Sequence, residues 1–182
     1  MGKEKFEEFI KQNETQEEEI NGEEKKQFFI EKVDDFYLML DKYLEPYQDN
    51  IKIEDSKINI YEEKLGSYEV TKRVLTIKGN NVEFTPIGTI LIGAWGRIDM
   101  EGPNGSVKFV LVPQKSSNPK IETAILLTDE DRKKWEEKQS REAKEIKEVT
   151  KVWKIATSAP NIRYFDLEEE IFFDKLMEVI DG

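Results

Sequence analysis

Three side chains suited to recognising a partner stand at alternating positions near the middle of the chain: Trp95, Arg97 and Asp99. In a β-strand, residues two apart point to the same side of the sheet, so these three are predicted to share one face. Tryptophan and arginine are the residue types that most often anchor protein interfaces. We therefore predict a binding surface formed by these residues and Lys108, with a structural Arg97–Asp99 ion pair as the alternative interpretation.

The same stretch has a second interpretation, as a hydrolytic site. An acidic residue on one strand with a lysine on the next, here Asp99 and Lys108, is similar to the arrangement in metal-dependent nucleases. Ser106 stands where the second carboxylate of that arrangement belongs, so Glu69, Glu83 or Glu101 would have to supply it. Because a divalent cation needs several carboxylate ligands, the alternative function is a divalent-metal hydrolase using Asp99 and Lys108.

The residue types that are missing exclude several kinds of chemistry. The chain has no cysteine and no histidine, so disulfides, thiol nucleophiles and Ser–His–Asp catalysis are excluded, as are zinc sites built on these residues. Gly88, Gly93 and Gly96 lie within a strand-like run and are not followed by Lys-Ser or Lys-Thr, which a phosphate-binding loop requires. No cofactor is predicted.

Charge is unevenly distributed along the 182 residues, whose net charge is −11. Residues 1–50 contain seven lysines and fifteen acidic residues, residues 51–128 are nearly neutral at +1, and residues 129–182 carry −4. An acidic chain repels phosphate backbones, so direct nucleic-acid binding is not expected and a basic protein partner is the complementary expectation. This charge composition is similar to that of small acidic bacterial proteins that neutralise a basic toxin or accompany a larger effector.

The sequence has neither a long apolar run nor an apolar segment behind its first residues, Met-Gly-Lys-Glu-Lys. We therefore expect no membrane span and no signal peptide, and we expect a cytoplasmic location. Together these observations predict a non-enzymatic, cytoplasmic protein-binding module of an immunity-like or accessory type. The metal hydrolase and a structural homo-oligomer are the alternatives.

The clearest helix is predicted over residues 22–45, with Asn21 as its N-cap and Pro46 as its stop. We expect residues 1–20 to form a loosely ordered or short helical segment before a single α+β domain over 21–182. The apolar residues of the helix follow one another at steps of four and three and form one stripe: Phe29, Val33, Phe36, Leu40, Tyr43 and Tyr47. This stripe is predicted to pack on a sheet, with a homodimer seam through the 22–45 helix as the alternative.

Six strands are predicted, most of them joined by short turns and therefore antiparallel. They lie at 51–60, 68–78, 82–84, 90–100, 107–112 and 121–127. The first strand is expected to contain a bulge or turn at 55–57, because its isoleucines change parity there. The stretch 86–113 is predicted to form the central hairpin of the sheet, with its turn at 102–105.

Two further helices are predicted in the last third of the chain. Thr128 is expected to cap a charged surface helix over 129–150, and Asp166 a C-terminal helix over 167–180. Residues 151–157 fit a helix or a strand, and we prefer a short strand. The buried side of the last helix is predicted to consist of Leu167, Ile171, Phe172, Leu176, Met177 and Ile180. The fold class is α+β: a twisted, mostly antiparallel sheet of about six strands, packed on one face by the N-terminal and C-terminal helices.

Overall fold

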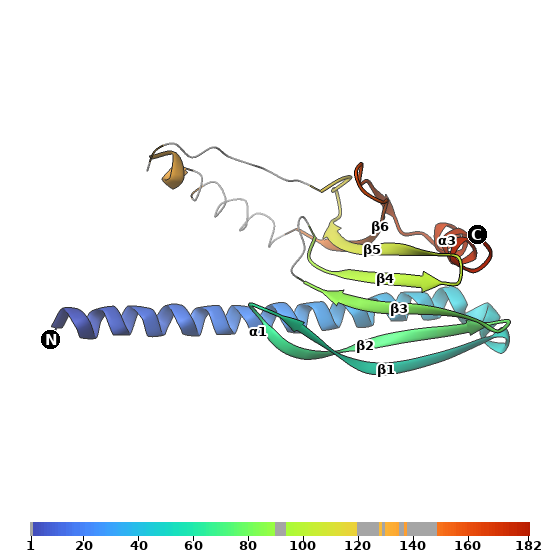
Figure 1. Cartoon of the computed structure of the whole chain (residues 1–182), viewed down its shortest axis with the longest axis horizontal. Helices are drawn as coiled ribbons and strands as arrows, with labels where there is room; N and C mark the ends of the chain where they lie inside the picture. The colour runs from blue at the N-terminus through green and yellow to red at the C-terminus, as the bar shows by residue number, and fades with distance from the viewer. Residues whose placement is uncertain (1, 90–93, 120–127, 129, 135–136, 138–148) are drawn as a thin grey trace.

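The computed structural model describes residues 2–89, 94–119, 128, 130–134, 137 and 149–182, with side chains from Gly22 onward. The chain forms one α+β domain with an open antiparallel sheet of seven strands in sequential order. The strands are β1 (Ile51–Glu62), β2 (Gly66–Ile77), β3 (Asn80–Gly88), β4 (Arg97–Gly102), β5 (Gly105–Pro113), β6 (Lys151–Ala156) and β7 (Tyr164–Asp166). The helices are α1 (Gly2–Leu44), the 3-10 helix η1 (Glu45–Asn50) and α3 (Glu169–Asp181) (Figure 1).

The sheet is antiparallel, as predicted, but it has seven strands, and they do not all coincide with the six predicted strands. Residues 151–156 and 164–166 both join it as β6 and β7, which confirms the preference for a strand at 151–157. The predicted strand at 121–127 lies outside the described residues. The predicted central hairpin is confirmed, because β4 and β5 occupy the middle of the strand order and turn between Gly102 and Gly105.

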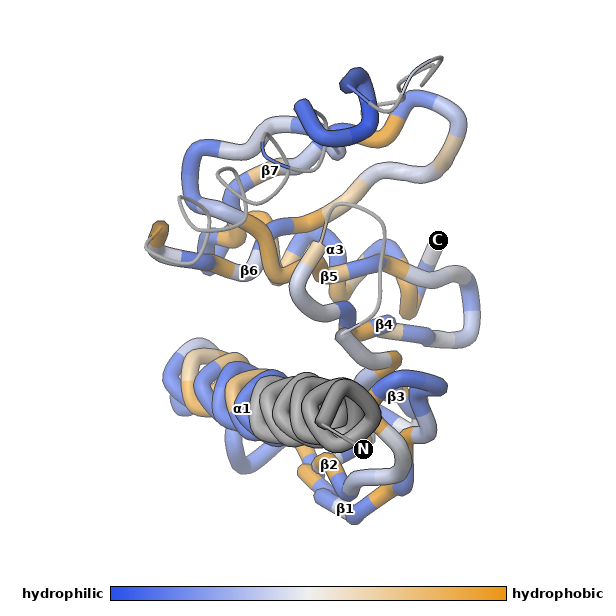
Figure 2. Tube along the Cα trace, turned by 90° about the vertical axis from the view of Figure 1, so that its left-hand side faces the viewer, coloured by the Kyte–Doolittle hydropathy of each residue, from blue (hydrophilic) through white to orange (hydrophobic). Residues whose placement is uncertain are grey.

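Helices α1 and α3 pack on the same face of the sheet, as predicted. Phe36 of α1 lies against Phe84 of β3 and Phe109 of β5, with ring centroids 6.2 and 5.0 Å apart. Phe172 of α3 lies 6.4 Å from Phe84 and joins the same cluster of buried rings. Figure 2, which views α1 end-on, shows the strands passing around this helix from β1 to β6. Burial of large aromatic side chains from both helices and the sheet therefore forms one core.

The apolar stripe of α1 packs against the sheet of the same chain. Phe29, Val33 and Leu40 are fully buried against the sheet, and only Tyr47, which lies beyond α1 in η1, is substantially exposed. Packing on a sheet, the first of the two predicted alternatives, thus accounts for the stripe. Its buried residues are not displayed for contact with a second copy of the chain.

The start of α1 differs from the prediction. The helix begins at Gly2 and runs unbroken through Asn21, so this asparagine is an interior residue and not a cap. Residues 11–20 are mostly Glu, Gln and Lys, which lose little conformational freedom in a helix, and nothing there stops the helix. Its first half extends beyond the strands (Figure 1).

Strand β1 contains no bulge, which corrects the prediction for residues 55–57. Its pairing with β2 keeps one register from Ile51–Ile77 to Glu62–Gly66. The buried side chains of β2 nevertheless switch from even-numbered residues, Tyr68 and Val70, to odd-numbered residues, Arg73 and Leu75. Because the register is constant, the whole β1–β2 ribbon rotates about its own axis, and two-stranded ribbons twist strongly.

The strand predicted over 90–100 begins as β4 only at Arg97. Residues 90–93 lie outside the described part of the chain, and Trp95 and Gly96 are irregular. A Cβ atom at Gly96 would lie 2.6 Å from ring atoms of Phe29. Glycine therefore allows the backbone to approach α1 closely just before the strand begins.

Helix α3 also begins later than predicted, and Asp166 does not cap it. The residue preceding the helix is Glu168, which makes no side-chain capping hydrogen bond, while Asp166 lies in β7 and pairs with Lys154 at 2.8 Å. Lys154 is only 6% exposed, and a buried ammonium group requires a carboxylate partner. The prediction that Met177 lies on the buried side of α3 was wrong, because this residue is exposed. Val179, which was not predicted, is buried instead.

The predicted helix over 129–150 lies mostly outside the described residues. Its predicted cap is present, because the Thr128 hydroxyl accepts a hydrogen bond from the Asp131 backbone N–H at 3.1 Å, and the Asp131 carboxylate accepts one from the Thr128 backbone N–H. No helix in the described part of the chain is long and apolar enough to cross a membrane.

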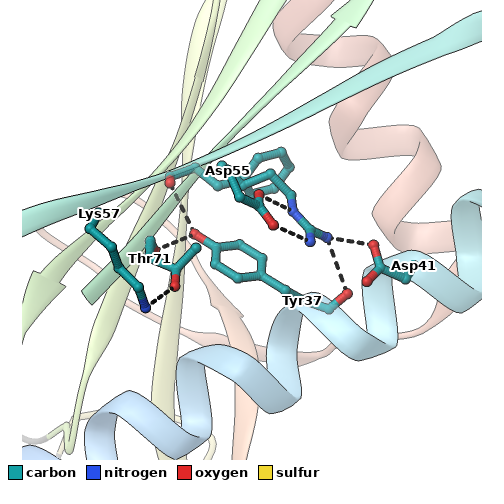
Figure 3. Close-up of polar contacts among 7 residues, drawn as sticks. Tyr37, Asp41, Asp55, Lys57 and Thr71 are labelled. Atoms are coloured by element: carbon teal, nitrogen blue, oxygen red, sulfur yellow. Dashed lines mark hydrogen bonds and ion pairs between the residues drawn. The ribbon is translucent and has the colours of Figure 1, made fainter. Parts of the chain in front are cut away.

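A buried arginine, Arg73, links the second half of α1 to the sheet. Figure 3 labels its partners Tyr37, Asp41 and Asp55. Arg73 on β2 is 5% exposed and donates two hydrogen bonds of 2.8 Å to Asp55 on β1. It donates a third, of 2.6 Å, to Asp41 on α1, and its guanidinium lies 4.5 Å from the ring centre of Tyr37. Burial lowers the pKa of Arg73, but the hydrogen bonds to both aspartates outweigh it, so the net pKa is raised.

The side chain of Tyr37 binds the backbone at the point where β2 and β3 stop pairing. The pairing of these strands ends at Arg73 and Phe84. The Tyr37 hydroxyl lies 3.1 Å from the carbonyl oxygens of both Thr71 and Phe84 and donates its proton to these acceptors. Burial raises the pKa of Tyr37, and the nearby Arg73 charge only partly offsets this. The carbonyl groups at the point where the β2–β3 pairing ends thus accept a hydrogen bond from a side chain of α1.

Candidate functional site

The predicted surface of Trp95, Arg97, Asp99 and Lys108 is divided in the structure. Arg97 and Asp99 form a two-pronged ion pair on β4, with distances of 2.6 Å from Nε to Oδ1 and 2.5 Å from Nη2 to Oδ2. The side chains are 28% and 13% exposed. The hydrogen bond to Asp99 raises the pKa of Arg97 more than burial lowers it. The pair is therefore a fixed charged element of the sheet, as the structural interpretation predicts.

Lys108 stands directly opposite Asp99, on β5, and is exposed. The two residues on which the hydrolase alternative depends are therefore neighbours. However, both oxygens of Asp99 accept hydrogen bonds from Arg97. Glu83, another acidic residue nearby on β3, is held by Lys72 at 2.5 Å. Within the described ranges, no group of three acidic residues is placed to hold a metal ion.

Trp95 lies against α1 and not beside the Arg97–Asp99 pair. Its ring meets the ring of Phe28 edge-on, with centroids 6.4 Å apart. The Lys151 ammonium group on β6 lies 4.3 Å from the centre of the Trp95 ring and 5.8 Å from that of Phe28. Cations over aromatic faces are attracted by the ring quadrupole. Burial lowers the pKa of Lys151.

These rings form one wall of a cleft of about 360 Å³. Its lining residues place the cleft where the turn between β1 and β2 meets α1, close to the end of β3. Figure 1 shows how these elements are arranged. We call it the Trp95 cleft. The residues that line it come from these three parts of the chain and from the segment before β4: Lys25, Phe28, Lys64, Leu65, Thr89, Ala94 and Trp95. Its size lies within the range of small-molecule sites.

A buried carboxylate behind the Trp95 cleft holds one of its lining residues, Thr89. Glu62, at the end of β1, is 8% exposed and accepts hydrogen bonds from the Tyr68 hydroxyl and from the Thr89 backbone N–H, the latter at 3.0 Å. The Thr89 hydroxyl lies 3.2 Å from the same oxygen. Burial, followed by the hydrogen bond to Glu62, raises the pKa of Tyr68 well above its usual range. The β1–β2 turn is thereby held at the end of β3.

Sequence reasoning identified Trp95 but missed the other residues of the cleft. Phe28 directly precedes the first stripe residue, Phe29, and lies outside the stripe. A large apolar residue at such a position could have indicated a second contact surface on the helix. Leu65, an apolar residue in a turn, was another. The link between Glu62 and Thr89 spans 27 residues and depends on the rotation of the β1–β2 ribbon, which no local pattern indicates.

Comparisons of the chain with models of protein families, with curated proteins and with solved structures found no match.

Proposed function

We propose that this chain is a non-enzymatic, cytoplasmic protein-binding module that binds a basic partner protein through α1. The observation that carries the proposal is the first half of this helix, which extends beyond the strands while the core is formed by the second half (Figure 1). A helix of this length that has no sheet beneath its first half suits contact with another molecule.

The charge of α1 supports a basic partner. Between Lys11 and Lys25 the helix carries six glutamates and no basic residue. Like charges four positions apart destabilise a helix by roughly 0.2–0.5 kcal/mol per pair, and Glu14 with Glu18 and Glu19 with Glu23 have this spacing. A positively charged partner would remove this repulsion and would be attracted over a distance of several ångströms.

The proposal is tested with the full chain as bait in cells of its source organism, followed by measurement of the dissociation constant with the purified partner. One reproducible partner with a basic contact surface is expected. A variant in which four glutamates of α1 become glutamine should bind it at least about tenfold more weakly: Glu14→Gln, Glu17→Gln, Glu18→Gln and Glu19→Gln.

A matched control removes the same number of charges from exposed glutamates elsewhere: Glu63→Gln, Glu69→Gln, Glu101→Gln and Glu170→Gln. It should bind within about twofold of the unmodified chain, because net charge alone contributes little at physiological salt. The proposal fails when no partner is captured reproducibly, or when both four-residue variants weaken binding equally.

A further inference from the structure

The Trp95 cleft carries two lysines whose charges have no partner in the described part of the chain. Lys25 on α1 and Lys64 in the β1–β2 turn both line the cleft and are exposed. Neither makes an ion pair or side-chain hydrogen bond with any described residue. The nearby Glu23 pairs with Lys26 and not with Lys25. Two lysines therefore line the cleft of a chain whose net charge is −11.

The wall between these lysines is apolar and aromatic. Phe28 and Trp95 contribute ring edges and faces, and Leu65 contributes an aliphatic side chain. Lys151, which does not line the cleft, lies over both rings and holds them against each other. The buried Glu62 carboxylate, which does not line the cleft, accepts hydrogen bonds from Tyr68 and from the lining residue Thr89.

We propose that the Trp95 cleft binds a small amphiphilic anion, a molecule with one carboxylate or sulfonate group on a flat apolar body. The apolar body packs against Phe28, Trp95 and Leu65, and the anionic group lies between the ammonium groups of Lys25 and Lys64. The volume of about 360 Å³ accommodates one such molecule. The hydrogen bonds of Glu62 hold the lining residue Thr89 in place before the ligand arrives, which lowers the entropic cost of binding.

The acidic surface of the chain does not prevent an anion from binding in the Trp95 cleft. At physiological ionic strength, charges on the surface are screened beyond roughly 8 Å. An anion in the cleft therefore interacts mainly with the lysines that line it. The proposal is independent of the proposed function, because it concerns neither the first half of α1 nor a basic partner.

Anilinonaphthalene sulfonate is a suitable probe, because it is a flat aromatic anion whose fluorescence rises in apolar surroundings. Its uncharged counterpart, phenylnaphthylamine, has the same rings without the sulfonate. Titration of the folded full chain with both probes at physiological salt is expected to give one saturable site for the anion. The neutral probe should bind at least about tenfold more weakly, since it cannot use the lysines.

Two double variants locate the site. K25Q/K64Q removes both cleft lysines and should weaken binding of the anionic probe by roughly tenfold, because two charge-assisted hydrogen bonds are lost. Binding of the neutral probe should not change. K42Q/K115Q removes two exposed lysines that do not line the cleft, and it should bind both probes as the unmodified chain does.

Circular dichroism before each titration confirms that the variants are folded, which they are expected to be because all four lysines are exposed. The proposal is overturned when the anionic probe does not saturate a single site, when the neutral probe binds equally well, or when both double variants lose affinity to the same extent. Failure to find a basic protein partner would leave these outcomes unaffected.

Discussion

Two phenylalanines of α1, eight positions apart, show how differently the two ends of the packed part of this helix are used. Phe36 is 1% exposed and contacts rings from β3, β5 and β6. Phe28 is only partly buried and faces Trp95 across the edge of an open cleft. The same residue type on the same helix therefore closes the core at one position and lines a binding cleft at the other.

The polar contacts follow the same division. Beside Phe36, Tyr37 and Arg73 connect α1 to two strands through hydrogen bonds whose donors and acceptors are all within the chain. Beside Phe28, Lys25 and Lys64 extend from the surface without a partner among the described residues. Satisfied polar groups stabilise a fold, whereas unneutralised charges around an apolar wall are available to a ligand.

The largest effect is expected for Phe36→Ala. Truncating a fully buried phenylalanine loses transfer free energy and leaves a cavity, so the free energy of unfolding should fall by about 3–5 kcal/mol. Chemical denaturation measures this loss directly. Phe165→Ala, at a site 50% exposed, is the control and should change stability by less than about 1 kcal/mol. Equal losses at both positions would contradict the core described above.

Arg73→Met should lower the free energy of unfolding by about 2–3 kcal/mol. It leaves Asp41 and Asp55 without their cation, but these side chains are 44% and 42% exposed and regain some water, so the loss is below that of a fully buried pair. Arg73→Lys keeps the charge without the two-pronged geometry and should lose less. Lys52→Met, which breaks an exposed pair with Glu54, should be almost neutral.

Stability is expected to fall above pH 10 because of Tyr37 and Tyr68. Both phenols have raised pKa values in the fold, whereas in the unfolded chain they titrate near about pH 10. Their contribution is therefore complete below pH 10 and is lost as the pH rises toward the folded pKa. From about pH 9 to about pH 11, each tyrosine should account for about 1 kcal/mol of lost stability. Y37F/Y68F should show a correspondingly smaller decrease, and an unchanged decrease would rule out this cause.

A much smaller effect on stability than that of Phe36→Ala is expected for Phe28→Ala. The side chain is partly exposed and makes one ring contact with Trp95, so the free energy of unfolding should fall by about 1 kcal/mol or less. Affinity for anilinonaphthalene sulfonate should decrease, because part of the apolar wall is removed. A loss of stability as large as that of Phe36→Ala would show that the cleft is part of the core.

The parts of the fold that local patterns specify were predictable. The 3.6-residue spacing of the α1 stripe identified Phe29, Val33, Phe36 and Leu40 as buried, and all four are. Alternation and turn residues identified the β4–β5 hairpin. Arg97 and Asp99, two positions apart on one strand, form the ion pair that was the alternative interpretation of these residues.

The parts that depend on contacts between distant segments were not predictable from local patterns. Asp166 followed the pattern of a helix cap, but the buried Lys154 on the neighbouring strand engages it instead. Trp95 was assigned to the face of Arg97 by alternation, but the irregular backbone before β4 brings it to α1. For the same reason the Trp95 cleft, which four separate segments form, could not be assembled from the sequence.

The division of α1 into a half that packs in the core and an acidic half that we propose binds a partner is tested most directly by the salt dependence of partner binding. Between about 50 and about 300 mM salt, the dissociation constant for the captured partner should rise at least about fivefold, because screening weakens attraction between opposite charges. The four-glutamine variant of α1 should show a much smaller rise. A dissociation constant that is the same at both salt concentrations would contradict binding through the acidic half of the helix.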